Sequence, residues 1–291
     1  MMPPVVATVE GIRQAVGDAR RRGLTVGLVP TMGALHAGHL SLCRAARAET
    51  GFVVATIFVN PTQFGPNEDF ARYPRQLEID RELCGQAGVD AIFAPAVPTM
   101  YPANFHTFVE VLDLSAGLCG ASRPGHFRGV TTVVLKLFNI VGADTAYFGQ
   151  KDFQQARLIR QLVHDLNVPL QVQICPIVRE SDGLAMSSRN QYLDPTQRRH
   201  AVALYQALQA AQRTIEEGER DPEAIRGLLV RRIEDTPGAI LDYAAVVDAD
   251  RLQPLPRLHG EVLLALAVKF GATRLIDNIL VQVRAEQRPM K

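Results

Sequence analysis

Two histidines, three positions apart, lie in a glycine-rich turn with the sequence Val29-Pro-Thr-Met-Gly-Ala-Leu-His-Ala-Gly-His39. The turn follows a β-rich run over 24–29 and precedes a helix expected over 38–49. A helix N-terminus presents free N–H groups and a partial positive charge, and Gly33 and Gly38 would let the backbone approach a ligand. His36 and His39 could therefore hydrogen-bond phosphate groups. A structural or metal-binding histidine pair is the alternative.

A lysine lies at a second strand-to-helix transition, Phe148-Gly-Gln-Lys-Asp-Phe-Gln-Gln155. Lys151 is one of only four lysines among 31 basic residues. At the carboxyl end of a strand, a cation is well placed to clamp a phosphate. The alternative is a solvated lysine at a helix start. The loop Ala185-Met-Ser-Ser-Arg-Asn190 adds two hydroxyls and a guanidinium, and it is either a linker or a loop that closes over a triphosphate.

Two glutamines offer neutral donors and acceptors. Gln63 follows the run 52–59, and Gln155 opens the helix expected over 153–165. Such amides can orient a substrate carboxylate without the ion pair that would quench its nucleophilicity. The segment 123–128 has two arginines and a histidine, which fit either anion binding or structural charge pairing. Lys136, in an apolar helix expected over 130–140, is either a buried lysine that is paired or functional, or one that extends to solvent.

The elements that must position these residues alternate through the first two thirds of the chain. Strands are expected at 24–29, 52–59, 91–94, 108–112, 146–148 and 170–174, with helices at 38–49, 77–87, 130–140 and 153–165. Pro30 is expected to end the first strand. This rhythm predicts a Rossmann-like, doubly wound parallel sheet that binds its ligand at the carboxyl ends of the strands.

The pattern changes after Pro176. One long helix is expected over 196–217 and a second over 222–235, followed by strands at 242–247, 261–268 and 274–283. Helices followed by consecutive strands predict a smaller α+β domain with an antiparallel sheet. We therefore expect an N-terminal domain over 1–178 and a C-terminal domain over 179–291.

Composition excludes several classes. The net charge is +1, from 31 basic and 30 acidic residues, which argues against a nucleic-acid or membrane partner. Neither a P-loop nor GxGxxG is present, which argues against P-loop NTPases and NAD-dependent dehydrogenases. The four cysteines form no CxxC pair, and no secretory signal or long apolar span is apparent. These features predict a cytoplasmic protein.

Five segments together resemble the pantoate–β-alanine ligase (pantothenate synthetase) family of HIGH-motif nucleotidyltransferases. In chain order they are PTMGALHAGHL, FVNPTQFGPNEDFARYPR, RPGHFRGV, YFGQKDFQQ and MSSRN, within about residues 25–195. Ala37 stands where glutamate is frequent in the family, and Phe153 where tyrosine is common.

The resemblance implies that ATP, Mg²⁺, pantoate and β-alanine are used to form pantothenate through a pantoyl adenylate, in a homodimer. It implies catalytic roles for His36, His39 and Lys151, and pantoate binding by Gln63 and Gln155, with metal ligands left unassigned. By the same resemblance, the ATP site comprises Met32, Gly33, Ala34, Leu35, His36, Ala37, Gly38, His39, Gly149, Gln150, Lys151, Asp152, Val178, Met186, Ser187, Ser188 and Arg189.

The resemblance also makes the C-terminal domain a lid, and loop composition makes residues 65–75 a candidate mobile gate. The alternative function is that of another HIGH-motif nucleotidyltransferase, acting on a phosphate ester. That reaction would need a cationic pocket for the second phosphate, whereas Gln63 and Gln155 suit a small hydroxy acid.

Overall fold

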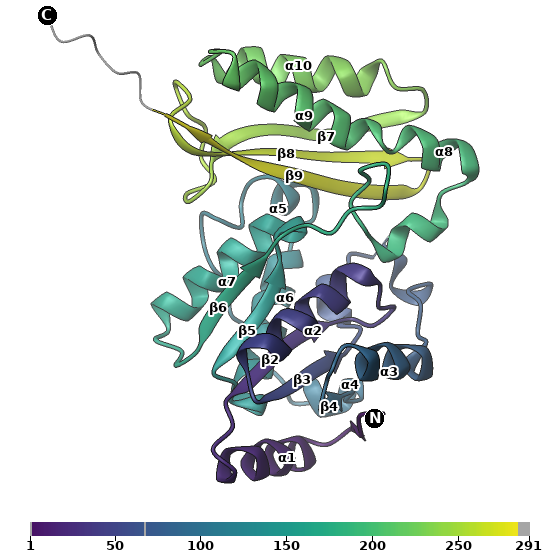
Figure 1. The fold of residues 1–291 in the computed structure, drawn as a ribbon, viewed down its shortest axis with the longest axis vertical. Coiled ribbons are helices and arrows are strands. Elements are labelled where there is room, and N and C mark those ends of the chain that lie inside the picture. The colour runs from purple at the N-terminus through teal and green to yellow at the C-terminus, as the bar shows by residue number, and fades with distance from the viewer. Residues whose placement is uncertain (1, 67, 285–291) are drawn as a thin grey trace, which may run out of the picture. The chain divides into compact units, whose positions relative to one another are not determined.

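The computed structural model describes residues 2–66 and 68–284, which fall into two units (Figure 1). The first unit runs to Ala116 and resumes over Arg123–Val178, while the second takes Gly117–Ser122 and the chain from Arg179 onward. The short excursion over Gly117–Ser122, which includes helix α5 (Cys119–Ser122), has no counterpart in the sequence-based expectation.

A parallel sheet forms the centre of the first unit. Its order within the described chain is β1-β4-β3-β2-β5-β6, as the doubly wound prediction requires. The strands are β1 (Val5–Val6), β2 (Val26–Thr31), β3 (Phe52–Ile57), β4 (Ala91–Phe93), β5 (Thr145–Gly149) and β6 (Gln171–Cys175). β2, β3 and β4 are buried on both sides almost throughout, which explains their near-continuous apolar sequences.

Helices cover both faces of this sheet. Helix α6 packs against both α1 and α7, and α2 packs against α3. Right-handed crossovers place these two groups on opposite faces. The helices are α1 (Val9–Arg21), α2 (Ala37–Glu49), α3 (Leu77–Gln86), α6 (His126–Val141) and α7 (Phe153–Asp165), with a short α4 at Val97–Met100.

The strand order reverses between β2 and β5. From β2 the chain moves through α2 to β3, and from β5 it moves through α7 to β6 on the other side. The two strands are neighbours, paired at Gly27 with Thr145 and at Leu28 with Ala146. Their carboxyl ends therefore flank the topological switch point, where ligands bind in open α/β sheets. The histidine turn follows β2, and the lysine segment follows β5.

The structure corrects one strand end. β2 runs through Pro30 to Thr31 instead of ending before the proline. The carbonyl of Thr31 accepts a hydrogen bond from Phe58 N–H, so this residue faces β3. Pro30 therefore faces the β5 side, where pairing ends at Leu28, and its missing N–H costs no ladder bond.

Two further expectations are wrong. Residues 108–112 form no strand, because the described chain supplies no strand beside them. The long helix expected over 196–217 is divided into α8 (Pro195–His200) and α9 (Ala203–Glu216). At the break, the N–H of Leu204 bonds the carbonyl of Ala201, three residues back, which tightens the chain into a turn.

The second unit is an antiparallel sheet of order β7-β8-β9 with helices on it, as predicted. The strands are β7 (Ala239–Asp248), β8 (Gly260–Phe270) and β9 (Thr273–Val283), and α10 spans Pro222–Glu234. A cluster that includes Leu204, Leu208, Ile225 and Leu264 joins α9 and α10 to the sheet. No helix in the described part of the chain is both long and apolar enough to cross a membrane.

Helix α6 approaches the segment after β3 so closely that it needs a glycine. A Cβ at Gly129 would lie 2.3 Å from the carbonyl oxygen of Thr62 and 2.8 Å from Gln63 N. Those neighbours are backbone atoms and cannot rotate away, so the glycine sets the distance between α6 and the Gln63 segment.

We predict that Gly129→Ala lowers the free energy of unfolding by about 1–3 kcal/mol, the usual effect of overpacking a tight contact. Urea denaturation followed by circular dichroism measures this. Gly117→Ala is the matched control, because nothing lies within 4 Å of a Cβ there. Equal stability of the two variants would contradict the packing argument.

Candidate active site

A buried carboxylate fixes the turn between β2 and α2. The side chain of Asp80, 1% exposed, accepts hydrogen bonds from Ala34 N–H at 2.9 Å and Leu35 N–H at 2.8 Å. Gly33 and Ala34 have φ of 83° and 52°, in the left-handed region. A Cβ at Gly33 would lie 2.9 Å from Asp80 Oδ2, so this position requires glycine. Asp80 could not be recognised from the sequence, because nothing in the pattern of residues 77–87 marks one acidic residue as buried.

The two histidines cap helix α2 reciprocally. Nδ1 of His36 accepts a hydrogen bond from Gly38 N–H at 3.1 Å, and Nδ1 of His39 accepts one from His36 N–H at 3.4 Å. The ring centroids are 4.1 Å apart. Because both Nδ1 atoms accept from the backbone, each ring carries its proton on Nε2 when it is neutral. The pair therefore has a structural role at the start of α2.

His39 is uncharged near neutral pH. Burial of the ring and the neighbouring His36 lower its pKa from 6.5 to about 3, with a smaller lowering by Lys151 and an opposing effect of Asp152. His39 can therefore donate a hydrogen bond to an anion but does not meet it as a cation. A proton-donor role is disfavoured at this pKa.

Lys151 lies on the other side of the switch point. It is half-buried in η3 (Gln150–Asp152), a 3₁₀ turn between β5 and α7. The charges of Lys151 and Asp152 both act on His39, so the turn after β5 lies near the turn after β2. The fold thus brings together the two segments that the sequence analysis connected with phosphate binding.

Gln63 lies beside the same turn. It ends η1 (Pro61–Gln63), where its Nε2 donates to Met32 Sδ at 3.0 Å and its Oε1 accepts from Asn60 Nδ2 at 3.0 Å. Asn60, 1% exposed, also donates to the carbonyl of Gly129 at 3.1 Å. Asn60 therefore orients Gln63 and ties it to α6. Asn60 was not predicted as a site residue, although it lies in the segment FVNPTQFGPNEDFARYPR.

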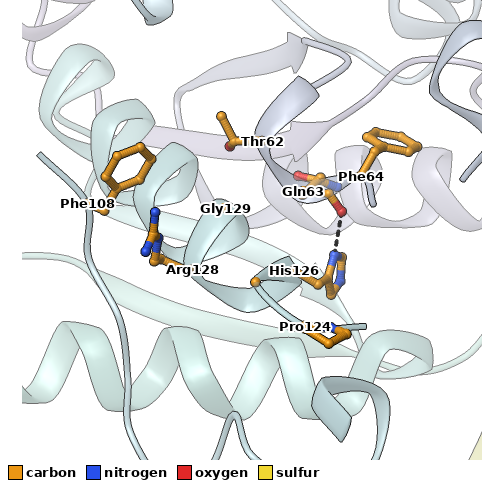
Figure 2. Close-up of a pocket in the computed structure, with 9 residues that line it drawn as sticks. Thr62, Gln63, Phe64, Phe108, Pro124, His126, Arg128 and Gly129 are labelled. Carbon is orange, nitrogen blue, oxygen red and sulfur yellow. Dashed lines mark hydrogen bonds between the residues drawn. The ribbon is translucent and has the colours of Figure 1, made fainter. Parts of the chain in front are cut away.

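A cavity of about 400 Å³ opens beside Gln63 (Figure 2). His126 lies beside Gln63, and its Nδ1 donates a hydrogen bond to the backbone carbonyl of Gln63 at 2.8 Å. Residues 62–64, Phe108, 124–126, Arg128 and Gly129 line the cavity. Gln63 thus lies at the edge of a space large enough for a small organic acid.

One of the two arginines of 123–128, Arg123, proves to be paired with a carboxylate. Arg123 forms an ion pair with Glu68 at 2.6 Å and donates to His126 Nε2 at 2.9 Å. Burial and the Arg123 charge lower the pKa of His126 to about 4. Burial alone would raise the pKa of Glu68, but the hydrogen bond and the positive charge of Arg123 lower it overall. Arg123 therefore stabilises Glu68 as a carboxylate. The charge-pairing alternative therefore describes Arg123.

Lys136 also has an internal partner. Its Nζ lies 4.8 Å from the ring centroid of Phe105 and 5.9 Å from that of Tyr101. Burial lowers the pKa of this lysine. A cation–π contact of this kind accounts for the lysine in an otherwise apolar helix, and no site role is needed.

The remaining predicted site residues are distributed over both units. Gln155 is half-buried in the first turn of α7, and Val178 ends the first unit. Met186–Arg189 belong to the second unit, where the Ser187 hydroxyl caps η4 (Ser188–Tyr192) by accepting from Arg189 N–H at 3.2 Å. That Gln155, Val178 and Met186–Arg189 lie close to the histidine turn stays a prediction.

The gate over 65–75 also stays a prediction, and its Asn67 lies outside the described residues. On either side of that position, Phe64 packs edge-on against Phe70 and Tyr73. Among the described residues, no three His, Cys, Asp or Glu side chains gather in a way that could hold a metal ion.

Comparison with known proteins identifies the family. Residues 4–280 match the family model described as pantoate-beta-alanine ligase. A pantothenate synthetase from Moorella thermoacetica is 59% identical over 279 residues, spanning 96% of this chain and 99% of the relative. One from Acetivibrio thermocellus is 53% identical with the same coverage.

Solved structures agree. Pantothenate synthetase from Thermus thermophilus matches with a TM-score of 0.91 and 46% identity, over 97% of this chain and all of that one. A pantoate-beta-alanine ligase from Francisella tularensis, solved as a complex with β-γ ATP and β-alanine, matches with a TM-score of 0.77 and 35% identity, over 96% of this chain and 97% of that one. The chain belongs to the pantoate–β-alanine ligase family.

Proposed function

We propose that this chain condenses pantoate with β-alanine, using ATP, by way of a pantoyl adenylate and with release of AMP and pyrophosphate. One observation carries the proposal: Gln63, a neutral amide beside a small cavity, is hydrogen-bonded to Met32 of the histidine turn. The arrangement supports an acid carboxylate held next to a nucleotide phosphate. Family membership favours this reaction over transfer to a phosphate ester.

The first step needs orientation more than proton transfer. A pantoate carboxylate is ionised at neutral pH, so its oxygen can attack the α-phosphate without a general base. The bond from the α-phosphate to pyrophosphate breaks as the new bond forms. Gln63 and Gln155 would hold the acid by neutral hydrogen bonds, and this leaves the attacking oxygen nucleophilic.

The phosphates would meet two kinds of donor. The Nε2–H groups of His36 and His39 would donate hydrogen bonds, that of His39 from a neutral ring, and the ammonium of Lys151 would supply charge at the developing pyrophosphate. Three further groups of residues would complete the nucleotide site. They are the rest of the turn (Met32, Gly33, Ala34, Leu35, Ala37 and Gly38), the residues at the end of β5 (Gly149, Gln150 and Asp152), and Val178, Met186, Ser187, Ser188 and Arg189. In the second step the β-alanine amine attacks the mixed anhydride and displaces AMP.

We further propose a division of labour between the domains. Residues 1–178 would bind ATP and pantoate, and 179–291 would act as a lid that protects the adenylate from water. Mg²⁺ would arrive as MgATP, since this ion keeps several waters and is held largely by substrate phosphates. The protein would work as a homodimer in the cytoplasm, where the free thiols of Cys43, Cys84, Cys119 and Cys175 stay reduced.

Isotope exchange between pyrophosphate and ATP tests the proposal. We expect exchange with ATP and pantoate alone, because the adenylate forms before β-alanine reacts, and AMP release only after β-alanine is added. Exchange that requires a phosphorylated acceptor instead of pantoate would overturn the proposed reaction.

Lys151→Ala should slow adenylate formation by about 10²-fold or more, the scale of losing one preorganised donor at a developing charge. Single-turnover formation of the adenylate measures this rate. Lys269→Ala is the matched control, since Lys269 is an exposed lysine on β8 of the second unit. An unchanged rate in Lys151→Ala would remove this residue from the site.

Gln63→Ala should raise KM for pantoate about tenfold or more, the loss expected for a hydrogen bond to a charged group, with KM for ATP unchanged. Gln63→Glu should raise it further, because a second carboxylate repels the acid. Gln253→Ala, at an exposed position of the second unit, is the control. A selective loss of ATP affinity in Gln63→Ala would contradict the assignment.

A further inference from the structure

The loop Met186–Arg189 follows a short hairpin over residues 179–185, which we call the base hairpin. Its two ends, Arg179 and Ala185, pair as an antiparallel bridge. Near its tip, Gly183 has a φ of 97°, in the left-handed region that a tight turn requires. The base hairpin therefore fixes the point from which the loop starts, and all of it belongs to the second unit.

The guanidinium of Arg179 fastens the base hairpin to the sheet and to a helix. It forms a bidentate ion pair with Asp277 of β9, with Nη1–Oδ2 at 2.6 Å and Nη2–Oδ1 at 2.9 Å. Asp277 is only 2% exposed. The same guanidinium donates to the carbonyl of Gly183 at 3.1 Å, and its Cζ lies 3.7 Å from the ring centroid of Tyr205 in α9. Arg179 thus joins β9, α9 and the hairpin tip.

Asn190 closes the loop on its other side. Its Nδ2 donates to Glu180 Oε1 at 2.9 Å and to the carbonyl of Ala185 at 3.1 Å. The second oxygen of Glu180 accepts from Arg198 of α8 at 2.6 Å. Ala185 precedes the loop and Asn190 follows it, so the four residues between them leave from one point and return to it. In agreement, η4, which contains Asn190, packs against β9 (Figure 1).

The ion pair between Arg179 and Asp277 contributes direction more than stability. An apolar cluster that includes Leu184 and Leu204 already packs the base hairpin and α9 together. A buried ion pair loses its hydration, and apolar residues of similar volume often stabilise a fold equally well or better. Two parallel N–H···O bonds, however, fix the plane of the guanidinium relative to the strand. Such a pair at the base of a loop is suited to holding that loop in one orientation.

We propose that Asp277 is a positioning residue for ATP. Through Arg179 it holds the loop Met186–Arg189 so that the two hydroxyls and the guanidinium of the loop meet the triphosphate. This proposal rests on the proposed function, in which the loop completes the nucleotide site. A displacement of about 1 Å in a group that orients the substrate can slow a reaction by about 10²-fold.

The two steps of the proposed reaction need this loop to different degrees. In the first step the loop would meet the phosphates that leave as pyrophosphate. In the second step the bond to pyrophosphate is already broken, and the β-alanine amine attacks the carbonyl carbon of the adenylate. A displaced loop should therefore weaken ATP binding and slow adenylate formation, and it should leave the attack by β-alanine almost unchanged.

Asp277→Asn tests the proposal, because it keeps the shape of the side chain and removes its charge. We expect single-turnover adenylate formation to slow by about 10- to 100-fold and KM for ATP to rise, with the β-alanine step changed less than about twofold. The second step is measured by adding β-alanine to the enzyme-bound adenylate. An equal fall in both steps would indicate a loss of folded enzyme and would overturn the positioning role.

The double variant Arg179→Met with Asp277→Leu separates positioning from stability. Neither charge is then left buried without its partner, so the midpoint of thermal unfolding should recover relative to Asp277→Asn. Adenylate formation should stay slow, because the directional bonds are lost. Recovery of the wild-type rate together with the wild-type midpoint would overturn the positioning role.

A second ion pair of β9 supplies the matched control. Arg274 and Asp242 are 20% and 17% exposed and pair at 2.7 Å. In the described chain, neither of them hydrogen-bonds any residue of 179–190. Arg274→Met with Asp242→Leu should therefore keep the wild-type rate of adenylate formation. A slowing equal to that of the first double variant would contradict a specific role for Asp277.

The outcomes distinguish this inference from the proposed function. Adenylate formation at the wild-type rate in Asp277→Asn would overturn the positioning role, while pyrophosphate exchange by the wild type with pantoate would keep the proposed reaction. A wild-type protein without that exchange would overturn the proposed reaction and, with it, the role of the loop.

Discussion

The site depends on one buried carboxylate. Asp80 accepts two backbone N–H groups from the turn after β2, and so holds Gly33 and Ala34 in the left-handed conformation. Left unpaired in the interior, each N–H would cost about 1–3 kcal/mol. Because the turn is fixed, helix α2 starts at a defined place, and the two histidine rings that cap it are held at the switch point of the sheet.

The cap determines what the histidines can do. Both Nδ1 atoms are occupied by backbone N–H groups, so the chemistry is left to Nε2. Burial and mutual proximity make the charged form of His39 unfavourable. The strong positive charge is placed instead on Lys151, across the switch point. A neutral donor at His39 and the cation of Lys151 suit a reaction whose nucleophile is already ionised and whose charge develops on a leaving pyrophosphate.

Sequence patterns predicted the helices and strands that have a clear hydrophobic periodicity, and the motifs that follow them. The parallel strands, the two-part architecture and the positions of His36, Lys151 and Gln63 at strand ends all follow from periodicity and turn chemistry. The burial of Asp80 and Asn60 could not be predicted, because the local sequence carries no signal for a tertiary hydrogen bond. Residues 108–112 have strand composition, yet pairing is a property of two segments, and the described chain places no strand beside them. The pairing of Arg123 with Glu68 likewise joins residues 55 positions apart.

The protonation state of His39 tests the central claim most directly. It can be read from ¹⁵N chemical shifts of the imidazole nitrogens during a pH titration of the labelled protein. We predict a neutral ring with its proton on Nε2 throughout pH 5–8, with protonation only as the pH approaches about 3. A titration midpoint near the ordinary value of 6.5, or a proton on Nδ1 at neutral pH, would contradict the account of the capped, neutral histidine turn.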